Sequence, residues 1–414
     1  MPSFAIQNFG CRVNQAEAFS WAEELARSGL KQERDPARAD FVVVNTCTLT
    51  AGADRDVRKF IRRVSRLNPS ARLVIAGCSV DGGGVRQGGL APGTLLLSNT
   101  DKAELPGRIL SFVGAREDGA VKPPRSRALL KVQDGCDRGC TFCVIPSVRG
   151  PSRSLPREEI LARAQSMTAA GYREIVLCGI HLSSYGLDRN PRDSLAGLLE
   201  SLVEIEGLGR IRLSSLDPRR LDGRLLSLIT EDPRVCPHFH LSLQHASDRV
   251  LKLMGRGSTA AGHERTLGRL RERAPDAALG ADLIVGFPGE EADDFGRLRD
   301  FVERSPLDYL HVFTFSPRPG TPAAGWPQVG ESEKKRRSAD LRAVGADKRA
   351  AFRGRFLERE LDAVVIKKGS VSAEVLTSNY IDVRIPACSA EPGGSVRVKI
   401  TRLETGRALG EEAG

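Results

Sequence analysis

The sequence is poor in aromatic residues and has no long hydrophobic run. Aromatic residues make up 5% of its 414 residues, although 40% are hydrophobic and 28% are charged. This balance is typical of a soluble globular protein and argues against disorder. The longest apolar runs, FVVVN and RLVIAGC, are far shorter than the roughly 18 to 20 residues of a membrane helix. A chain of this length is expected to form two or three domains.

The N-terminus, MPSFAIQNFGC, lacks the basic segment and long apolar segment of a secretory signal. We therefore expect a cytoplasmic protein without a membrane partner. The formal charge of +10 favours an acidic partner such as a nucleic acid. Basic residues gather in two stretches: residues 122–157 carry eight Lys or Arg against two Asp, and residues 331–359 carry ten against five acidic residues.

Nine cysteines is an odd number, and a cytosolic chain keeps its thiols reduced, so a disulfide framework is not expected. Three of them, Cys11, Cys47 and Cys78, each follow a short apolar run. Because the loops beyond parallel strands gather ligands at one sheet edge, we expect these three thiols to meet and to ligate a metal or cluster. The alternative is three separately buried thiols.

Alternating strand and helix patterns define the predicted domains. Residues 1–112 predict a small parallel α/β domain, and residues 113–127, rich in Gly, Pro and charge, predict a linker. Residues 128–345 contain six strand patterns separated by helical stretches, which predict a partial (β/α)6 barrel. After a basic helix, residues 346–414 predict a small all-β barrel. The predicted fold class is therefore α/β with a C-terminal β-barrel.

The strongest motif is GCDRGCTFC, which places Cys136, Cys140 and Cys143 in a C-x3-C-x2-C run after the first strand of the second domain. A structural zinc site needs four ligands, and no fourth Cys or His lies nearby in sequence. A cubane iron–sulfur cluster accepts three thiolates and leaves one iron open. An open iron can bind the amine and carboxylate of S-adenosylmethionine. This spacing, with Phe142 before the third cysteine, resembles the radical-SAM superfamily.

Taken over nearly its whole length, the chain resembles the methylthiotransferase family that includes MiaB, RimO and MtaB. The motifs that carry the resemblance are FGCRVNQAE, NTCTLTAGAD, IAGCSV, GCDRGCTFCVIPSVRG, EIVLCGIHLSSYG, RLSSLDP, HFHLSLQ, DLIVGFPGE and FSPRPGTPA. The GCRVNQAE and GIHLSSYG segments are most similar to the MtaB branch. The sequence departs from the family pattern at Ser79–Gly84, His245 and Gly257.

The resemblance implies two [4Fe–4S] clusters. Cys136, Cys140 and Cys143 would hold the cluster that cleaves S-adenosylmethionine, and Cys11, Cys47 and Cys78 an auxiliary cluster that delivers sulfur. Residues at family positions for S-adenosylmethionine are Phe142, Ser214, Gln244, Arg256 and Gly286. Candidates to meet a substrate nucleotide are Arg149, His181, Tyr185 and Arg318. We interpret Cys178, Cys236 and Cys388 as buried structural thiols.

The implied reaction is 2-methylthiolation of N6-threonylcarbamoyladenosine at position 37 of tRNA. The implied partners are the tRNA anticodon stem-loop, an electron donor such as flavodoxin or ferredoxin, and a sulfur donor. The C-terminal barrel resembles the TRAM module, which binds nucleic acid. Alternatives are MiaB-like methylthiolation of isopentenyladenosine-37 and RimO-like methylthiolation of a ribosomal-protein aspartate. A non-catalytic RNA-binding protein with a cluster or zinc is disfavoured, because binding alone gains nothing from open iron positions.

Overall fold

The computed structural model describes residues 1–85, 90–113, 126–404 and 406–413. These residues form two compact units, one built from 1–124, 134–152 and 316–324, and the other from 125–133, 153–315 and 325–414. Each unit is described separately below, as unit 1 and unit 2. Most of the predicted linker, residues 114–125, lies outside the described residues, and the domain boundaries stay a prediction.

Unit 1 contains a parallel five-stranded sheet in the order β2-β1-β3-β4-β5. The strands are β1 (Ser3–Asn8), β2 (Lys31–Gln32), β3 (Phe41–Thr46), β4 (Arg72–Gly77) and β5 (Leu95–Leu97). The helices are α1 (Arg12–Arg27), α2 (Ala51–Leu67), α3 (Cys78–Asp81), α4 (Leu105–Val113) and α5 (Ile145–Arg149). In this strand order, the sheet has its topological switch point between β1 and β3, where ligands of open α/β sheets gather.

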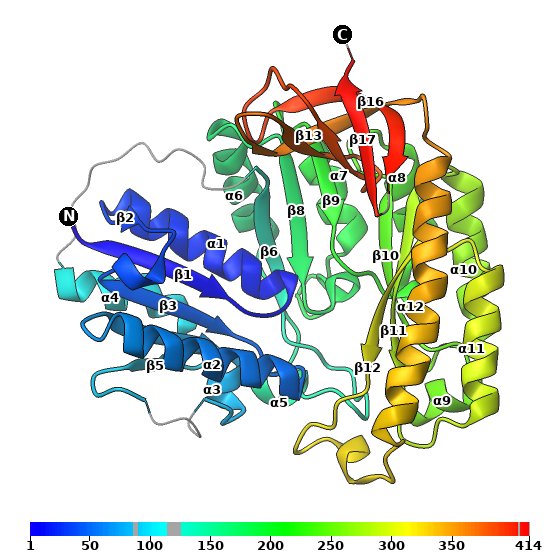
Figure 1. Cartoon of the computed structure of the whole chain (residues 1–414), viewed down its shortest axis with the longest axis horizontal. Coiled ribbons are helices and arrows are strands. Elements are labelled where there is room, and N and C mark those ends of the chain that lie inside the picture. Colours follow the sequence, from blue (N-terminus) through cyan, green and yellow to red (C-terminus); the bar gives the residue numbers. More distant parts are fainter. Residues whose placement is uncertain (86–89, 114–125, 405, 414) are drawn as a thin grey trace. The chain divides into compact units, whose positions relative to one another are not determined.

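The side-chain period of β3 explains the two helical layers of unit 1. Val43 faces one core, which contains residues of α1 and α4, whereas Val42 and Val44 face another, which contains residues of α2. Because successive strand side chains alternate between faces, one apolar strand serves both cores. Figure 1 shows α1 and α2 on opposite faces of this sheet.

Unit 2 contains the six strands that the sequence predicts after residue 128. They are β6 (Ala128–Asp134), β8 (Glu174–Gly179), β9 (Arg210–Leu213), β10 (His238–Gln244), β11 (Ala278–Val285) and β12 (Tyr309–Thr314). β6, β8 and β9 form one parallel sheet with the two-residue strand β7 (Arg153–Ser154) at its edge, and β10, β11 and β12 form another. Parallel bridges at Ile211–Val235 and Leu216–Leu241 connect the two sheets. The result is an open, partial barrel.

Helices alternate with these strands, as expected for right-handed βα crossovers. They are α6 (Arg157–Ala169), α7 (Leu195–Val203), α8 (Gly223–Glu231), α9 (Asp248–Leu253), α10 (Ala260–Arg273), α11 (Ala292–Arg304) and α12 (Glu331–Gly354). The side chains of Ser194, Asp222 and Thr259 accept hydrogen bonds from the first turns of α7, α8 and α10, which fixes where those helices begin. No helix in the described part of the chain has the length and apolar character required to cross a membrane.

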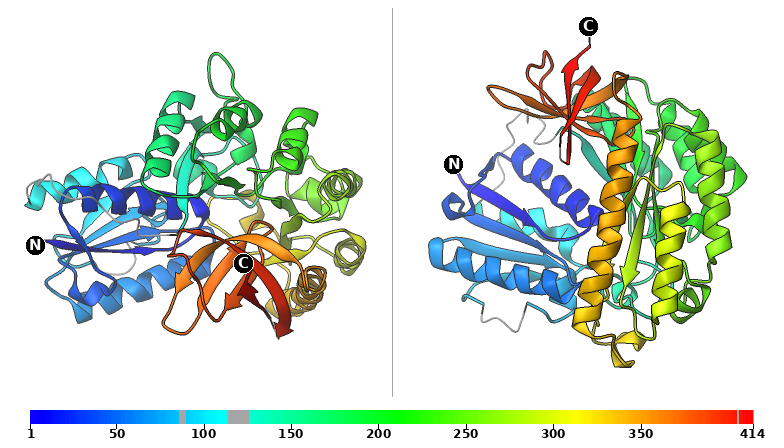
Figure 2. Two further views of the ribbon diagram at one scale, coloured as in Figure 1. Left: turned by 90° about the horizontal axis from the view of Figure 1, so that it is seen from above. Right: turned by 45° about the vertical axis from the view of Figure 1, so that its right-hand side comes forward.

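The C-terminal strands close into a barrel in the order β13-β14-β15-β17-β16 (Figure 2). They are β13 (Glu360–Lys368), β14 (Ala373–Thr377), β15 (Asp382–Ile385), β16 (Ser395–Glu404) and β17 (Arg407–Glu412). Closure leaves no exposed sheet edge. The barrel core continues into Phe352 and Phe356 at the end of α12 and into Tyr309 of β12. The predicted fold class, α/β with a C-terminal β-barrel, is confirmed.

A buried carboxylate joins the N-terminal ends of three strand regions in unit 2. Glu174 of β8 lies 2.8 Å from Arg212 Nε, 3.2 Å from Arg210 Nε and 3.4 Å from an Arg127 nitrogen. Burial alone raises the pKa of Glu174, but the guanidinium groups outweigh it and lower the pKa to about 2. Arg212 also donates to the carbonyls of Thr377 and Ser378, so this ion cluster reaches the C-terminal barrel.

We expect Glu174→Gln to lower the free energy of unfolding at pH 7 by about 3–5 kcal/mol, because it leaves buried guanidinium groups without their anion. The Glu174 pKa in the folded chain lies below its ordinary value of 4.5. Its contribution to stability is therefore present above pH 4.5 and is lost as the pH falls toward 2. Urea unfolding followed by circular dichroism at several pH values measures both effects.

Glu200→Gln is the matched control, because Glu200 pairs with Arg224 at an exposed position. Exposed ion pairs contribute little to stability, so this variant should unfold close to the wild-type midpoint. Equal losses in the two variants would contradict the role given to Glu174.

Candidate cluster and cofactor sites

In unit 1, three cysteines lie at the carboxyl ends of neighbouring parallel strands. Cys11 precedes α1 after β1, Cys47 directly follows β3, and Cys78 begins α3 after β4. The thiols interact electrostatically with one another, so the three loops bring them together. Gly10 permits the approach, because a Cβ at this position would lie 2.6 Å from Cys47 Cβ. Its φ of +113° is also one that glycine adopts without strain.

Burial makes the Cys11 and Cys47 thiols poor free anions. It raises the pKa of Cys11, and it raises the pKa of Cys47 to about 12, although the backbone at Leu49 works in the opposite direction. A buried thiolate is therefore costly unless a cation or a metal is bound beside it. Three converging thiols, two on buried residues and one on the partly buried Cys11, have the chemistry that a three-thiolate [4Fe–4S] site requires.

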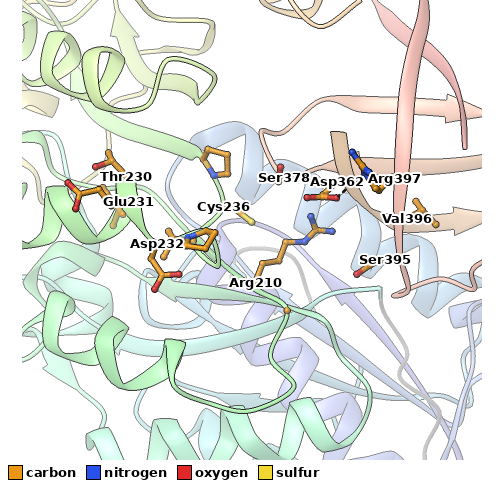
Figure 3. A pocket seen from close by; sticks show the side chains of 15 residues that line it. Arg210, Thr230, Glu231, Asp232, Cys236, Asp362, Ser378, Ser395, Val396 and Arg397 are labelled. Carbon is orange, nitrogen blue, oxygen red and sulfur yellow. Dashed lines mark ion pairs between the residues drawn. The ribbon is translucent and has the colours of Figure 1, made fainter. Parts of the chain in front are cut away.

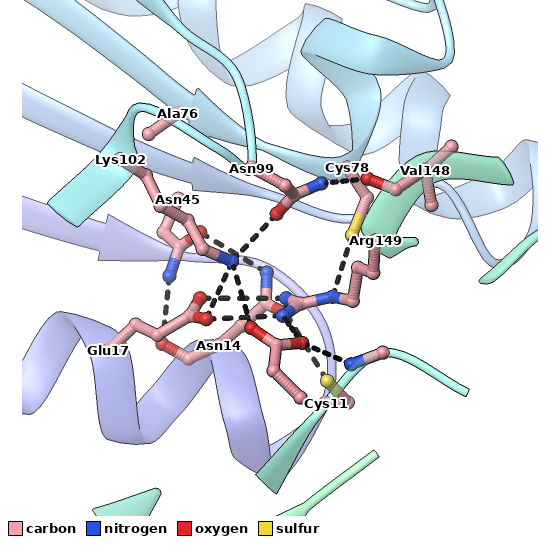
Figure 4. A network of polar contacts seen from close by, with 12 residues as sticks. Cys11, Asn14, Glu17, Asn45, Ala76, Cys78, Asn99, Lys102, Val148 and Arg149 are labelled. Carbon is pink, nitrogen blue, oxygen red and sulfur yellow. Dashed lines mark hydrogen bonds and ion pairs between the residues drawn. The ribbon is translucent and has the colours of Figure 1, made fainter. Parts of the chain in front are cut away.

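A network of buried polar and charged side chains lies beside Cys11 and Cys78 (Figure 4). Arg149 of α5 donates from Nε to Cys78 Sγ over 3.2 Å and from Nη2 to Asn14 Oδ1 over 2.7 Å. Cys11 Sγ lies 3.2 Å from the same Asn14 oxygen. The Arg149 side chain is fully buried, and it ion-pairs with Glu17 at 3.1 Å and Asp134 at 2.8 Å.

Lys102 completes the network. Its ammonium group lies 2.6 Å from Glu17 and 3.8 Å from Asp134 and donates to Asn99 over 2.7 Å. Two cations therefore balance two carboxylates in a buried site. Burial disfavours the Arg149 cation, but Glu17, Cys78 and Asp134 raise the pKa of Arg149 well above its ordinary value. The guanidinium is therefore a permanent positive charge beside the thiols.

The second cysteine set lies in the loop between β6 and α5, also within unit 1. Cys136 and Cys140 are buried and Cys143 is partly exposed. The loop closes through hydrogen bonds from the Cys136 N–H to the Gly150 carbonyl and from the Cys143 N–H to the Cys140 carbonyl, both 3.1 Å. Burial also raises the pKa of Cys136, and Cys140 adds to the shift.

Gly135 is required for this loop. Its φ is +68°, and a Cβ there would lie 1.9 Å from the Pro151 carbonyl oxygen. A side chain at position 135 would therefore clash with the backbone of Pro151, which cannot move aside as a flexible side chain could. Phe142, between the last two cysteines, is partly buried in the same loop.

In unit 2, the predicted cofactor residues lie at or beyond the carboxyl ends of β9, β10 and β11. Ser214 directly follows β9, and its Oγ is buried without a hydrogen-bond partner among the described residues. Gln244 ends β10 at a bulge with φ of +73°, an uncommon conformation for a residue other than glycine. Such strained positions concentrate at binding sites. Arg256 follows α9 and donates to the Ser242 carbonyl.

Gly286 follows β11 with φ of +70°. A Cβ there would lie 2.3 Å from Cγ of Lys334, a buried residue of α12. The glycine is therefore needed for helix packing, and a close approach to adenine stays a prediction for it.

The four residues predicted to meet a nucleotide all make polar contacts within their own unit. Arg149 lies beside Cys78, and Arg318 donates to Thr48 and Asp54 in unit 1. In unit 2, His181 lies 3.2 Å from Asp217, and Tyr185 donates to the Leu155 carbonyl with 1% of its surface exposed. Arg149 and Tyr185 are too buried for direct stacking on a base, so their positions favour structural roles. Their predicted contact with substrate stays untested.

The remaining cysteines divide into two groups. Cys178 and Cys236 are buried in unit 2, as predicted, and burial raises the pKa of Cys236 to about 11. The prediction for Cys388 was wrong, since this residue is only partly buried. It lies in the loop between β15 and β16, where the closed barrel presents its connections to solvent.

A cavity of about 500 Å³ in unit 2 lies between the ends of the barrel strands and the C-terminal barrel (Figure 3). Arg210, Cys236, Asp362, Ser378 and Arg397 are among its lining residues. None of the predicted cofactor or nucleotide residues lines it. The cavity is therefore separate from the carboxyl ends of the strands, where open α/β folds bind their ligands.

Comparisons with known proteins agree with this geometry. The radical SAM superfamily matches residues 130–302, and the uncharacterized protein family UPF0004 matches residues 3–86. The threonylcarbamoyladenosine tRNA methylthiotransferase MtaB of Aquifex aeolicus is 37% identical, over 96% of this chain and 99% of the relative. The chain belongs to the radical-SAM methylthiotransferase family and is of the MtaB type.

A related methylthiotransferase, the ribosomal protein uS12 methylthiotransferase RimO of Moorella thermoacetica, is 34% identical over 96% of both chains. Among solved structures, the radical S-adenosylmethionine methyltransferase TsrM of Kitasatospora setae has a TM-score of 0.56 at 14% identity. The match covers 78% of this chain and 75% of TsrM. At that identity the similarity supports the fold alone.

This methylthiotransferase uses S-adenosylmethionine and two [4Fe–4S] clusters. The structure fits that requirement, because unit 1 holds two separate sets of three cysteines and each set is partly or fully shielded from solvent. Shielding suits a cluster that must pass an electron to its ligand without loss to water.

Sequence reasoning missed the buried charges around the first cysteine set. Asn14 and Glu17 lie three and six residues after Cys11 within GCRVNQAE, and Asp134 directly precedes GC in the second motif. For Asn14 and Glu17 the available signal was that Cys11, Asn14 and Glu17 are each three residues from the next, since residues three apart share one helix face. No sequence pattern pointed to Lys102. It lies in the short turn before α4, which reaches this site only in the folded chain.

We expect Arg149→Met to destabilise the chain by about 3–5 kcal/mol, because Glu17 and Asp134 lose a buried counter-ion. The same change removes the donor to Cys78, so the protein should retain less iron after cluster reconstitution. Denaturant unfolding and iron per chain measure the two effects. Arg108→Met is the control, since Arg108 forms an exposed pair with Glu104. Wild-type iron content and stability in Arg149→Met would refute the role assigned to this arginine.

Proposed function

We propose that the chain attaches a methylthio group to C2 of N6-threonylcarbamoyladenosine at position 37 of tRNA. The observation that carries this proposal is the full-length similarity to MtaB proteins, which at 37% identity covers 99% of the Aquifex relative. MtaB proteins of Thermotoga maritima and Rickettsia prowazekii are 34% and 32% identical over 87% and 92% of this chain. The similarity includes both cysteine sets and is not confined to the radical-SAM domain.

Within this proposal, Cys136, Cys140 and Cys143 hold the cluster that binds S-adenosylmethionine, and Cys11, Cys47 and Cys78 hold the auxiliary cluster. The convergence of three loops at the first set, and the single loop that carries the second, support the assignment. Phe142, Ser214, Gln244, Arg256 and Gly286 are the proposed S-adenosylmethionine contacts. The strained backbone of Gln244 and the buried hydroxyl of Ser214 support two of these five.

When bound, the clusters and S-adenosylmethionine supply reductive cleavage, a carbon radical and the transferred sulfur. The residues of this chain contribute position and shielding. Burial keeps water away from Cys47 and Cys78, and the Arg149 guanidinium offsets the negative charge of ligating thiolates. Gly10 and Gly135 allow the two cysteine loops to turn tightly enough to present their sulfur atoms.

The proposed macromolecular partner is the anticodon stem-loop of tRNA, with the C-terminal barrel as an RNA-binding module of the TRAM kind. The closed five-stranded barrel supports this, since small closed β-barrels commonly bind single-stranded nucleic acid. His181 and Arg318 are proposed to help position the nucleotide. An electron donor such as flavodoxin or ferredoxin, a sulfur donor and a cytoplasmic location complete the proposal.

A second candidate is RimO-like methylthiolation of an aspartate in a ribosomal protein. The RimO protein of Moorella thermoacetica supports it, being 34% identical over 96% of both chains. MiaB-like modification of isopentenyladenosine-37 is a third. The N6 substituent of the adenosine distinguishes the two tRNA reactions, and tRNA dependence distinguishes both from the protein reaction.

Mass spectrometry of tRNA nucleosides from a strain that lacks this gene tests the proposal. We expect 2-methylthio-N6-threonylcarbamoyladenosine to disappear, the unmodified N6-threonylcarbamoyladenosine to accumulate, and complementation to restore the product. Loss of the methylthio-isopentenyl nucleoside instead would favour the MiaB-like reaction. An unchanged nucleoside profile with an unmodified ribosomal-protein aspartate would replace the proposal with the RimO-like one.

A pair of variants should distinguish the functions of the two cysteine sets. Cys140→Ala should abolish formation of 5′-deoxyadenosine from S-adenosylmethionine while the auxiliary cluster remains. Cys47→Ala should still form 5′-deoxyadenosine but yield no methylthiolated RNA. Chromatography of the deoxyadenosine and iron per chain measure these outcomes, and Cys178→Ala serves as a buried-thiol control that should keep both clusters. Normal product from Cys47→Ala would remove that residue from the ligand set.

A further inference from the structure

Three potential metal ligands share one face of the β10-β11-β12 sheet. Asp282 of β11 pairs in register with His311 of β12, and His240 of β10 pairs with Gly280, two residues before Asp282. Because side chains alternate along a strand and in-register neighbours point the same way, His240, Asp282 and His311 project from one face. All three residues belong to unit 2, whereas both cysteine sets belong to unit 1.

Their ligand atoms are close enough to bind one ion. Asp282 Oδ1 lies 2.9 Å from His240 Nε2 and 3.4 Å from His311 Nδ1, and all three ligand atoms lie within 4.8 Å of one another. Ligands bound about 2.0–2.2 Å from a tetrahedral zinc ion are separated by similar distances. The arrangement therefore needs little movement to accept an ion.

His240 Nε2 and Asp282 Oδ1 are the two closest of the candidate ligand atoms. The Nε2 atom is buried and has no hydrogen-bond partner of suitable geometry among the described residues, although Asp282 Oδ1 is only 2.9 Å away. An ion between them would use the lone pairs of both.

A second layer of contacts holds His240 in place. Its Nδ1 lies 2.9 Å from the Tyr309 hydroxyl, which also lies 2.7 Å from His238 Nε2. Metal-binding histidines generally use their other ring nitrogen in this way, which fixes the tautomer and the ring orientation. The His238 ring stacks on Tyr380 of the C-terminal barrel with centroids 3.9 Å apart, so the support extends beyond the sheet.

We propose that His240, Asp282 and His311 bind one divalent transition-metal ion of the zinc class, separate from the iron–sulfur clusters. Two imidazoles and one carboxylate suit a borderline ion such as Zn²⁺, whereas Mg²⁺ and Ca²⁺ prefer oxygen ligands alone. Three protein ligands leave a fourth position for water or another ligand. The His311 side chain is 48% exposed, so this position is on the accessible side of the site.

The bound ion would link three neighbouring strands, since each contributes one ligand. A ligand that binds only the folded state stabilises it in proportion to its saturation. Zinc should therefore raise the thermal unfolding midpoint of the cluster-loaded protein. The proposal concerns residues outside both cysteine sets, and its test needs no RNA substrate.

The test uses the cluster-loaded enzyme, dialysed anaerobically against Zn²⁺ and then freed of loosely bound metal. We expect one zinc per chain, with nitrogen and oxygen neighbours at about 2.0–2.1 Å by zinc X-ray absorption. Asp282→Asn and His311→Gln should each lower zinc retention at least tenfold and abolish the rise in unfolding midpoint. His311→Gln alters a half-exposed side chain, so it guards against a folding defect in the other variant.

Asp293→Asn, a change at an exposed aspartate of α11, is the matched control and should bind zinc like the wild type. Zinc with sulfur neighbours at about 2.3 Å would mean occupation of cysteine sites and would overturn the proposal. Absence of retained zinc, or equal retention in wild type and both ligand variants, would also overturn it and leave His240, Asp282 and His311 as an ion-paired group. Iron per chain and circular dichroism verify that each variant is folded and loaded.

Discussion

The burial of thiols beside a permanent positive charge is the constraint on which the cluster sites depend. A thiolate in a dry environment is expensive, and the first cysteine set lies where three parallel strands end in a buried edge. Arg149 makes that environment tolerable for negative sulfur, but a buried arginine itself requires anions. Glu17 and Asp134 supply these anions. Lys102 is the second cation, so that two positive charges balance the two carboxylates. Each charge therefore requires the next.

The cation beside the first cysteine set comes from the segment that follows the second cysteine motif. Arg149 belongs to the segment that follows Cys143, so the loop that carries one cysteine set supplies the cation for the other. Arg149 thus connects the segment after the second cysteine motif with the first cysteine set inside one compact unit.

Much of the fold could be predicted from the sequence, because its signals are local. Strand runs such as FVVVN and the helical pattern of α2 have the correct period, and the cysteine spacing around Cys140 is distinctive. The charge network could not be predicted, since Lys102 meets Glu17 only after the chain has folded. The same holds for His240, Asp282 and His311, which come from three strands and have no common sequence spacing. Cys388 was placed wrongly because composition alone does not separate a barrel core from its loops.

The continuity of the C-terminal barrel core with Tyr309 affects how that barrel can be studied. Its apolar interior continues into Phe352, Phe356 and Tyr309, and Tyr380 covers His238. Ending the chain before β13 would bare this surface to water and cut the carbonyl contacts of Arg212. A shortened enzyme that failed to modify RNA would thus have lost part of the core of its radical-SAM barrel as well as the proposed RNA-binding module. Substitutions on the outer surface of the C-terminal barrel are the means by which its proposed RNA binding can be separated from folding.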